Sequence, residues 1–233
     1  MSYATATRHQ PPPTRRVVRN NALWLVAALF GAIAGVLGIE HGYFETRQGN
    51  ETPGGIVISA VGPLCRASQA WHGCEPALTI IPNMRLTGIL AMIAGVAVVL
   101  WAVAFVQRRH GGLILLLLTL VLFLVGGGFT TLFFGMVAGV VGTQIHTPMP
   151  WFRAHRLGVA VRLLAVLWPW VLIAYLVWFV VEPVLGYLFN DFVLKLTPLM
   201  TIATPVLLLL VVAIAYAHDI RKQWDTPPAV KEG

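Results

Sequence analysis

The sequence predicts an all-α protein, a bundle of helices that crosses a membrane several times. Hydrophobic residues make up 58% of the 233 residues and charged residues only 11%, whereas about a quarter of an average soluble domain is charged. The apolar residues form continuous runs, without the alternation that is typical of transmembrane barrels. Because backbone N–H and C=O groups in lipid must pair within one segment, such runs are expected to form helices.

Five apolar runs are candidates for membrane spans, since about 20 residues cross the hydrocarbon layer. They are residues 22–39, 86–106, 113–145, 163–181 and 198–217. Residues 1–21 are basic and rich in proline, and we predict a disordered cytoplasmic tail. Residues 22–220 then form the bundle, and residues 221–233 form a second cytoplasmic tail. The first run is too long for a signal-peptide core and lacks a cleavage site, so we interpret it as a retained anchor.

The run 113–145 is too long for one ordinary span, and its middle reads LVGGGFTTLF. Three successive glycines make a poor helix interior, since each costs about 1 kcal/mol relative to alanine. Two short helices, of residues 111–126 and 129–145, would fit this pattern. One long, kinked helix would fit it as well and would reduce the number of spans from six to five.

The distribution of positive charge favours the hairpin. Lys and Arg are retained on the cytoplasmic side of a membrane, so the basic N-terminal segment is expected there. With the hairpin, twelve of the sixteen Lys and Arg side chains fall on that side, all except Arg47, Arg66, Arg85 and Lys195. We therefore predict six transmembrane helices with both termini cytoplasmic. The net charge of +7 then reflects topology and gives no indication of nucleic-acid binding.

Small residues and prolines predict how the helices pack. Gly31, Gly35 and Gly38 share one helix, and Gly135 and Gly139 repeat the same spacing in the second arm of the hairpin. Glycines at this spacing allow helix backbones to approach closely. The last two spans carry Pro169 and Pro205, which are expected to kink them.

Residues 45–83 form the long extracytoplasmic loop of this topology. They contain the only two cysteines, Cys65 and Cys74, with eight residues between them. A lone pair on an outward-facing loop predicts a disulfide, which would stabilise the fold by about 2–3 kcal/mol. A redox-active pair or a metal site is the alternative, although redox dithiols usually have two intervening residues.

Five titratable side chains gather at the outer surface in this topology and are candidate catalytic or binding residues: Glu40, His41, Glu45, His72 and Glu75. If the first helix continues past Glu40, then His41 and Glu45 lie one turn apart on the same face. His41, Glu45, His72 and Glu75 also form a plausible, though disfavoured, metal-binding set. They could equally act as acid and base at a lipid headgroup.

A structural role explains these residues more simply, and we favour it. Glu40 would then form an ion pair with Arg85 across the first helix hairpin, while His41 would lie in the interfacial belt. Gly42 weakens the helical continuation that the site requires. The dipeptide Glu75-Pro76 is typical of a helix start, and Glu182-Pro183 indicates a boundary at the outer end of the fifth span.

No cofactor is indicated by sequence motifs. Phosphate loops, dinucleotide fingerprints, metalloprotease helices and nucleophile elbows do not occur. Four histidines near cytoplasmic helix ends could ligate a haem or a pigment, but arginines lie beside them, so we interpret them as interfacial residues: His110, His146, His155 and His218. Charged residues lie at the ends of the predicted spans, which disfavours a proton pump or a voltage sensor.

Three segments carry a resemblance to known proteins: EHGYFETRQGN, EPALTIIPN and the turn LVGGGF. Together they resemble a group of small bacterial multi-pass membrane proteins, over roughly residues 22–150. The resemblance implies a setting in the bacterial plasma membrane. It implies no activity, cofactor or residue role.

The leading functional hypothesis is a non-catalytic protein of the bacterial inner membrane. It would be an accessory subunit of a membrane complex, or it would bind a lipid or another apolar ligand between its helices. One alternative is a membrane-embedded enzyme that uses the outer His and carboxylate residues. A second alternative is a transporter of a neutral solute. The expected partners are membrane lipids and other membrane subunits, with no nucleic acid.

Overall fold

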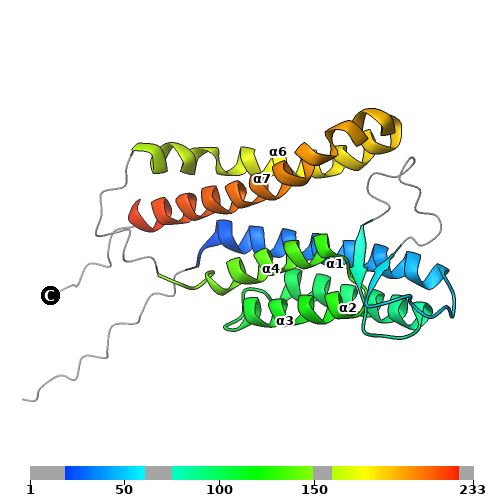
Figure 1. Cartoon of the computed structure of the whole chain (residues 1–233). Coiled ribbons are helices and arrows are strands. Elements are labelled where there is room, and N and C mark those ends of the chain that lie inside the picture. Colours follow the sequence, from blue (N-terminus) through cyan, green and yellow to red (C-terminus); the bar gives the residue numbers. More distant parts are fainter. Residues whose placement is uncertain (1–18, 61–74, 149–158, 226–233) are drawn as a thin grey trace, which may run out of the picture.

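The computed structural model describes residues 19–60, 75–148 and 159–225, which form helices and two short strands (Figure 1). The helices are α1 (Asn21–Arg47), α2 (Met84–Ala104), α3 (Gly111–Leu124), α4 (Phe129–Thr143), α6 (Val159–Leu188) and α7 (Asn190–Asp225). The strands β1 (Val57–Ser59) and β2 (Pro76–Leu78) pair antiparallel, with Ile58 opposite Ala77.

The predicted all-α class is confirmed, and the segment 113–145 is a hairpin of two helices. Within the described ranges, α1, α2, α6 and α7 are long and apolar enough to cross a membrane. The arms α3 and α4 have 14 and 15 residues, a rise of about 21 Å each. The structure therefore defines a membrane-compatible helical protein, while the number of six spans stays a prediction.

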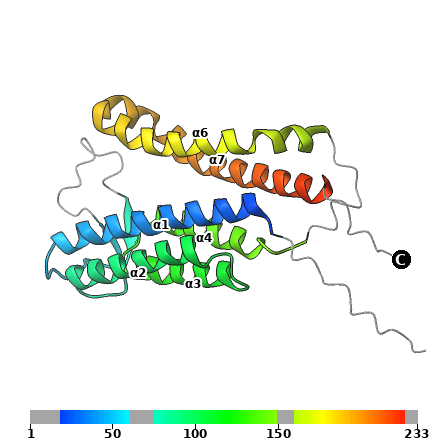
Figure 2. The same cartoon turned by 180° about the vertical axis from the view of Figure 1, so that it is seen from behind.

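Helices α1 to α4 form one compact bundle, and α6 and α7 form a hairpin that packs on α1 (Figures 1 and 2). Phe30 of α1 lies at the junction. Its ring centroid is 5.8 Å from that of Phe134 in α4 and 5.5 Å from that of Tyr175 in α6. Below, the two ends of the molecule are called the Asn20 end, where α1 begins, and the His41 end, where the strands lie.

Glycines bring α1 and α2 into backbone contact, as their spacing predicted for α1. Gly35 opposes Gly95, and Gly42 opposes Gly88 one heptad further along; a Cβ on either member of each pair would overlap the backbone of the other helix. The helices therefore pack at a distance that only glycine permits at these four positions.

A carboxylate of α7 caps the first helix at the Asn20 end. Asp219 is buried and accepts hydrogen bonds from the backbone N–H groups of Ala22 (3.2 Å) and Leu23 (2.9 Å). These amides have no partner inside α1, and the side chain of Asn20, which precedes the helix, does not cap them. Asn20 instead donates to the carbonyl of Gln144 (2.8 Å), just beyond α4. The first turn of α1 thus joins α4 and α7.

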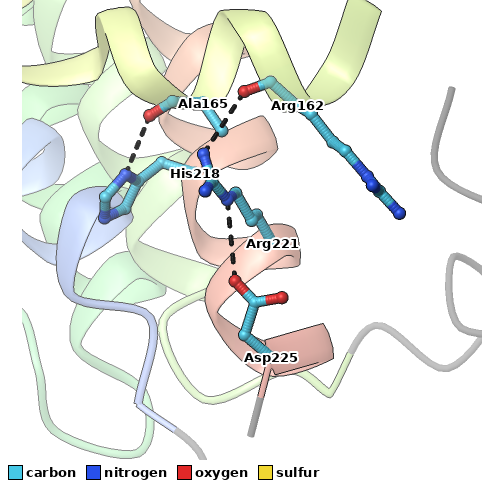
Figure 3. A network of polar contacts seen from close by, with 5 residues as sticks. All are labelled: Arg162, Ala165, His218, Arg221 and Asp225. Carbon is cyan, nitrogen blue, oxygen red and sulfur yellow. Dashed lines mark hydrogen bonds and ion pairs between the residues drawn. The ribbon is translucent and has the colours of Figure 1, made fainter. Parts of the chain in front are cut away.

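Neighbouring residues of α7 hold the same end of α6 (Figure 3). The ring of His218 contacts the carbonyl of Ala165 at 3.1 Å, and Arg221 donates to the carbonyl of Arg162 at 3.4 Å. Arg221 also pairs with Asp225 one turn later, at 3.6 Å, and both side chains are exposed to solvent. These contacts therefore link α6 to α7 next to Asp219, the residue that caps α1.

Replacing Asp219 by alanine is expected to lower the free energy of unfolding by about 1–2 kcal/mol, because two helix N–H groups lose their acceptor. Asp225→Asn is the matched control, since an exposed i,i+4 ion pair contributes only about 0.3–0.5 kcal/mol. Thermal unfolding of both variants in detergent gives the comparison. Equal losses would show that the Asp219 cap contributes nothing beyond a surface charge.

Three boundaries predicted from the sequence are wrong. Helix α1 continues to Arg47, so the segment that follows it begins at residue 48, three residues later than expected. Glu75-Pro76 does not start a helix, because Pro76 opens β2 and the next helix begins at Met84. Glu182-Pro183 does not end a helix either, since α6 passes through Pro183 to Leu188.

Candidate functional site

The extension of α1 places two titratable side chains on one buried face. His41 and Glu45 are one helical turn apart, and their exposed fractions are 9% and 0%. Gly42 does not interrupt the helix there, because the close approach of α2 requires a residue without a side chain at that position. The prediction that His41 and Glu45 share one face of the helix is therefore confirmed.

Glu75 completes a polar cluster from the segment that precedes β2. Its Oε2 lies 3.6 Å from Nε2 of His41, and its other oxygen accepts a hydrogen bond from the backbone N–H of Thr130 in the first turn of α4. Burial raises the pKa of Glu75, but the bonds from His41 and Thr130 outweigh it, so the net pKa is lower than usual. Glu75 is thus an anion that caps the positive end of α4.

The turn between α3 and α4, Val125–Gly128, covers the other side of this cluster. A Cβ on Gly126 would overlap the carboxylate of Glu45, and a Cβ on Gly128 would overlap the ring of His41. Strand β2 leads directly into this contact, because the N–H of Ile80 donates to the carbonyl of Leu124 at 3.1 Å. His41, Glu45, Glu75 and the turn are called the outer cluster below.

A pair of hydroxyls fixes the strand beside the outer cluster. The Oγ1 atoms of Thr79 and Thr87 are 2.8 Å apart, and both residues are buried. Thr79 also accepts from the N–H of Ile81 at 3.0 Å. The segment after Glu75 is therefore held to the first turn of α2, which sets the position of the Glu75 carboxylate.

The structure brings together only some of the residues predicted from the sequence. His41, Glu45 and Glu75 meet in the outer cluster, whereas Glu40 and Arg85 are both exposed. The expected Glu40–Arg85 ion pair is absent from the described part of the chain, where the two ion pairs are His41–Glu75 and Arg221–Asp225. His72 and the cysteine pair Cys65 and Cys74 lie outside the described residues. No three His, Cys, Asp or Glu side chains within the described ranges are arranged to hold a metal ion.

The histidines near the other end contact the backbone. His146 lies 2.5 Å from the carbonyl of Gln107, and His218 lies 3.1 Å from the carbonyl of Ala165. His110 precedes α3 and provides no cap for it. His155 lies outside the described residues. The contacts of His146 and His218 link neighbouring helices, a structural use that fits the interfacial interpretation.

Two features of the site were not predicted from the sequence. The glycines of LVGGGF predicted a turn, but not that the turn would close over His41 and Glu45. The burial of Glu182 was not anticipated either, because this residue lies within α6 with only 5% of its surface exposed. Its position before a proline had suggested a helix boundary.

These features define a class of helical protein whose four long apolar helices, within the described residues, are compatible with membrane insertion, and which has a buried polar cluster at one end of the bundle. No protein-family model, curated protein or solved structure matches the chain.

The Glu75 carboxylate is expected to make stability depend on acidity. Its folded pKa lies below the usual value of about 4.3, so its contribution is present above that pH and is lost as the pH falls through the folded pKa. Glu75→Gln should cost roughly 1–2 kcal/mol at neutral pH and should flatten the decline below about pH 4. Unfolding midpoints from pH 7 to pH 3 test this. Glu51→Gln, in an exposed loop position, should leave the profile unchanged.

Proposed function

We propose that this chain is a non-catalytic protein of the bacterial plasma membrane that binds an amphipathic lipid between α1 and the α6–α7 hairpin. Both termini would be cytoplasmic, and the His41 end would face outward. The observation that carries the proposal is that the hairpin packs on the bundle over only part of its length.

The hairpin contacts the bundle from the Asn20 end to about its middle. Along α6, buried residues that face the bundle recur at Trp168, Leu172 and Tyr175, and Phe179 still contacts Phe134 at 5.3 Å. In α7 the residues buried in the main core begin at Leu208. Beyond these points the hairpin and α1 diverge in both views (Figures 1 and 2). The diverging halves leave apolar surface that, in a membrane, must be covered by lipid chains or by another helix.

Buried polar side chains lie along the hairpin, both where it packs on the bundle and beyond that contact. The hydroxyl of Tyr175 and the indole N–H of Trp178 are buried, and within the described residues neither has a hydrogen-bond partner. The hydroxyl of Thr204 in α7 lies beside the carboxylate of Glu182. Glu182 lies on the same face of α6 as Tyr175, two turns further along. Buried polar groups normally have partners, and an ionisable group on a spanning helix indicates a binding role.

Two carboxylates lie at a similar height on the two sides of the divergence. Ala22 of α1 and Ala165 of α6 lie at one level, because they contact neighbouring residues of α7. Glu40 lies about 25 Å along α1 from Ala22, and Glu182 lies about 25 Å along α6 from Ala165. No Lys or Arg pairs with either of them in the described part of the chain. Negative charge at this height favours a phospholipid whose headgroup carries an ammonium group, such as phosphatidylethanolamine, with its acyl chains against the apolar helix faces.

The lipid that remains bound to the purified chain tests this proposal. The full chain is taken from native membranes into detergent, washed, and its lipids are extracted and quantified. We expect one amine-bearing phospholipid class to be retained in a stoichiometric amount and to fall several-fold in an E40Q/E182Q variant. The E51Q/D225N variant removes two exposed carboxylates elsewhere and should retain the lipid.

Two outcomes would overturn the proposal. Lipid retention that matches the bulk membrane composition would show that the divergence selects no headgroup. Retention of a stoichiometric second protein in place of lipid would assign the same surface to a partner subunit, and the chain would then be an accessory subunit of a complex.

A further inference from the structure

Among the described residues, Glu45 has no neighbouring group that would stabilise a negative charge. Its side chain is fully buried, and in the described part of the chain neither carboxylate oxygen accepts a hydrogen bond. A buried carboxylate is strongly unfavourable as an anion unless a cation or several donors pair with it. The carboxylate of Glu75, by contrast, receives both His41 and the Thr130 N–H.

The turn that covers Glu45 has no donor left for it. The N–H groups of Gly126, Gly127 and Gly128 all donate to backbone carbonyls of the same hairpin, at 3.4, 2.8 and 3.0 Å. The turn joins the negative end of α3 to the positive end of α4, and Glu75 already caps the α4 end. Glu45 therefore lies against a turn that offers it no hydrogen-bond donor.

The neighbouring elements supply no counter-charge. Helices α3 and α4 and strand β1 contain no titratable side chain, and α2 contains only Arg85, which is exposed. On α1, Glu40 and Arg47 are exposed, while His41 is directed to Glu75 and its Nδ1 has no partner among the described residues. Gly126 packs so closely on the carboxylate that even a Cβ would overlap it, so a hydrated metal ion has no space there.

We propose that Glu45 is a proton-binding site whose proton leaves only when the turn Val125–Gly128 separates from α1. While the turn is closed, Glu45 is a neutral carboxylic acid. When the turn opens, water reaches the carboxyl group and accepts the proton, and the carboxylate that remains is hydrated. Reclosure requires the proton to return. The ligand of the outer cluster is therefore a proton, and its release is coupled to the position of the α3–α4 hairpin.

Infrared spectroscopy of the purified full chain at neutral pH tests the protonation. A protonated carboxyl group gives a C=O stretching band that shifts on exchange into heavy water. We expect this band in the wild type and in E51Q, and its loss in E45Q. Absence of the band in the wild type would overturn the proposal even if E45Q failed to fold, and so would a band that E45Q leaves unchanged.

Thiol labelling tests the coupling to the turn. Cysteine is placed at Val125 in a chain whose own Cys65 and Cys74 are replaced by serine, and labelling rates are compared with and without E45Q across alkaline pH. The ratio of the two rates removes the ordinary effect of pH on the thiol. We expect the rate relative to the E45Q background to rise by up to about tenfold per pH unit, as release of one proton requires. A ratio independent of pH would overturn the coupling.

Discussion

Replacing Gly126 by alanine is expected to lower the free energy of unfolding by about 3 kcal/mol or more. Two costs combine at this position. The backbone of Gly126 has φ +118°, a conformation that costs a residue with a side chain about 1–3 kcal/mol. The added Cβ would also overlap the buried carboxylate of Glu45, and overpacking of a core typically costs about 1–3 kcal/mol more. Denaturant titration in mixed micelles gives the value.

Gly49→Ala separates the two costs. Gly49 also has a positive φ, +81°, but nothing lies within 4 Å of the position its Cβ would occupy. It should therefore show the conformational cost alone, about 1–2 kcal/mol. If Gly126→Ala and Gly49→Ala prove equally destabilising, the packing of Glu45 against the turn adds nothing to the free energy of unfolding. The outer cluster is then not closed over Glu45.

The outer cluster shows which parts of a site can be predicted from a sequence. His41 and Glu45 lie four residues apart on one helix, and this local spacing placed them on one face. Glu75 is 30 or more residues away, and only the topology of the spans suggested that it lies at the same surface. That it pairs with His41 and caps α4 depends on the pairing of β1 with β2 and on the position of the α3–α4 turn, which no local pattern encodes.

The contrast between local patterns and long-range contacts also explains why one predicted helix boundary is correct and another is wrong. Glycines and charge distribution correctly predicted that 113–145 is a hairpin, because a short turn with positive φ at Gly126 requires that composition. Pro183 suggested the end of a helix, yet α6 continues through it. A proline removes one backbone hydrogen bond, and neighbouring helices can compensate for that loss in a membrane protein.

The α1–α2 interface is the second place where one methyl group should have a large effect. Gly88→Ala would put a Cβ against the backbone of α1, 2.5 Å from the backbone N of Thr46. Backbone atoms cannot move aside as side chains do, so the two helices would have to separate. We expect a loss of about 2–3 kcal/mol, measured by denaturant titration of the full chain.

Gly38→Ala is the matched control for this effect. Its Cβ would meet only the side chain of Leu122, at 2.6 Å from one methyl group, and a leucine side chain can rotate at a cost of about 1 kcal/mol. A loss at Gly38 as large as that at Gly88 would mean that side-chain crowding, and not backbone contact, sets the spacing of these helices. A smaller loss at Gly38 would place the constraint in the Gly42–Gly88 contact, directly beside His41. The close approach of α1 and α2 would then be what allows α1 to carry His41 and Glu45 into the outer cluster.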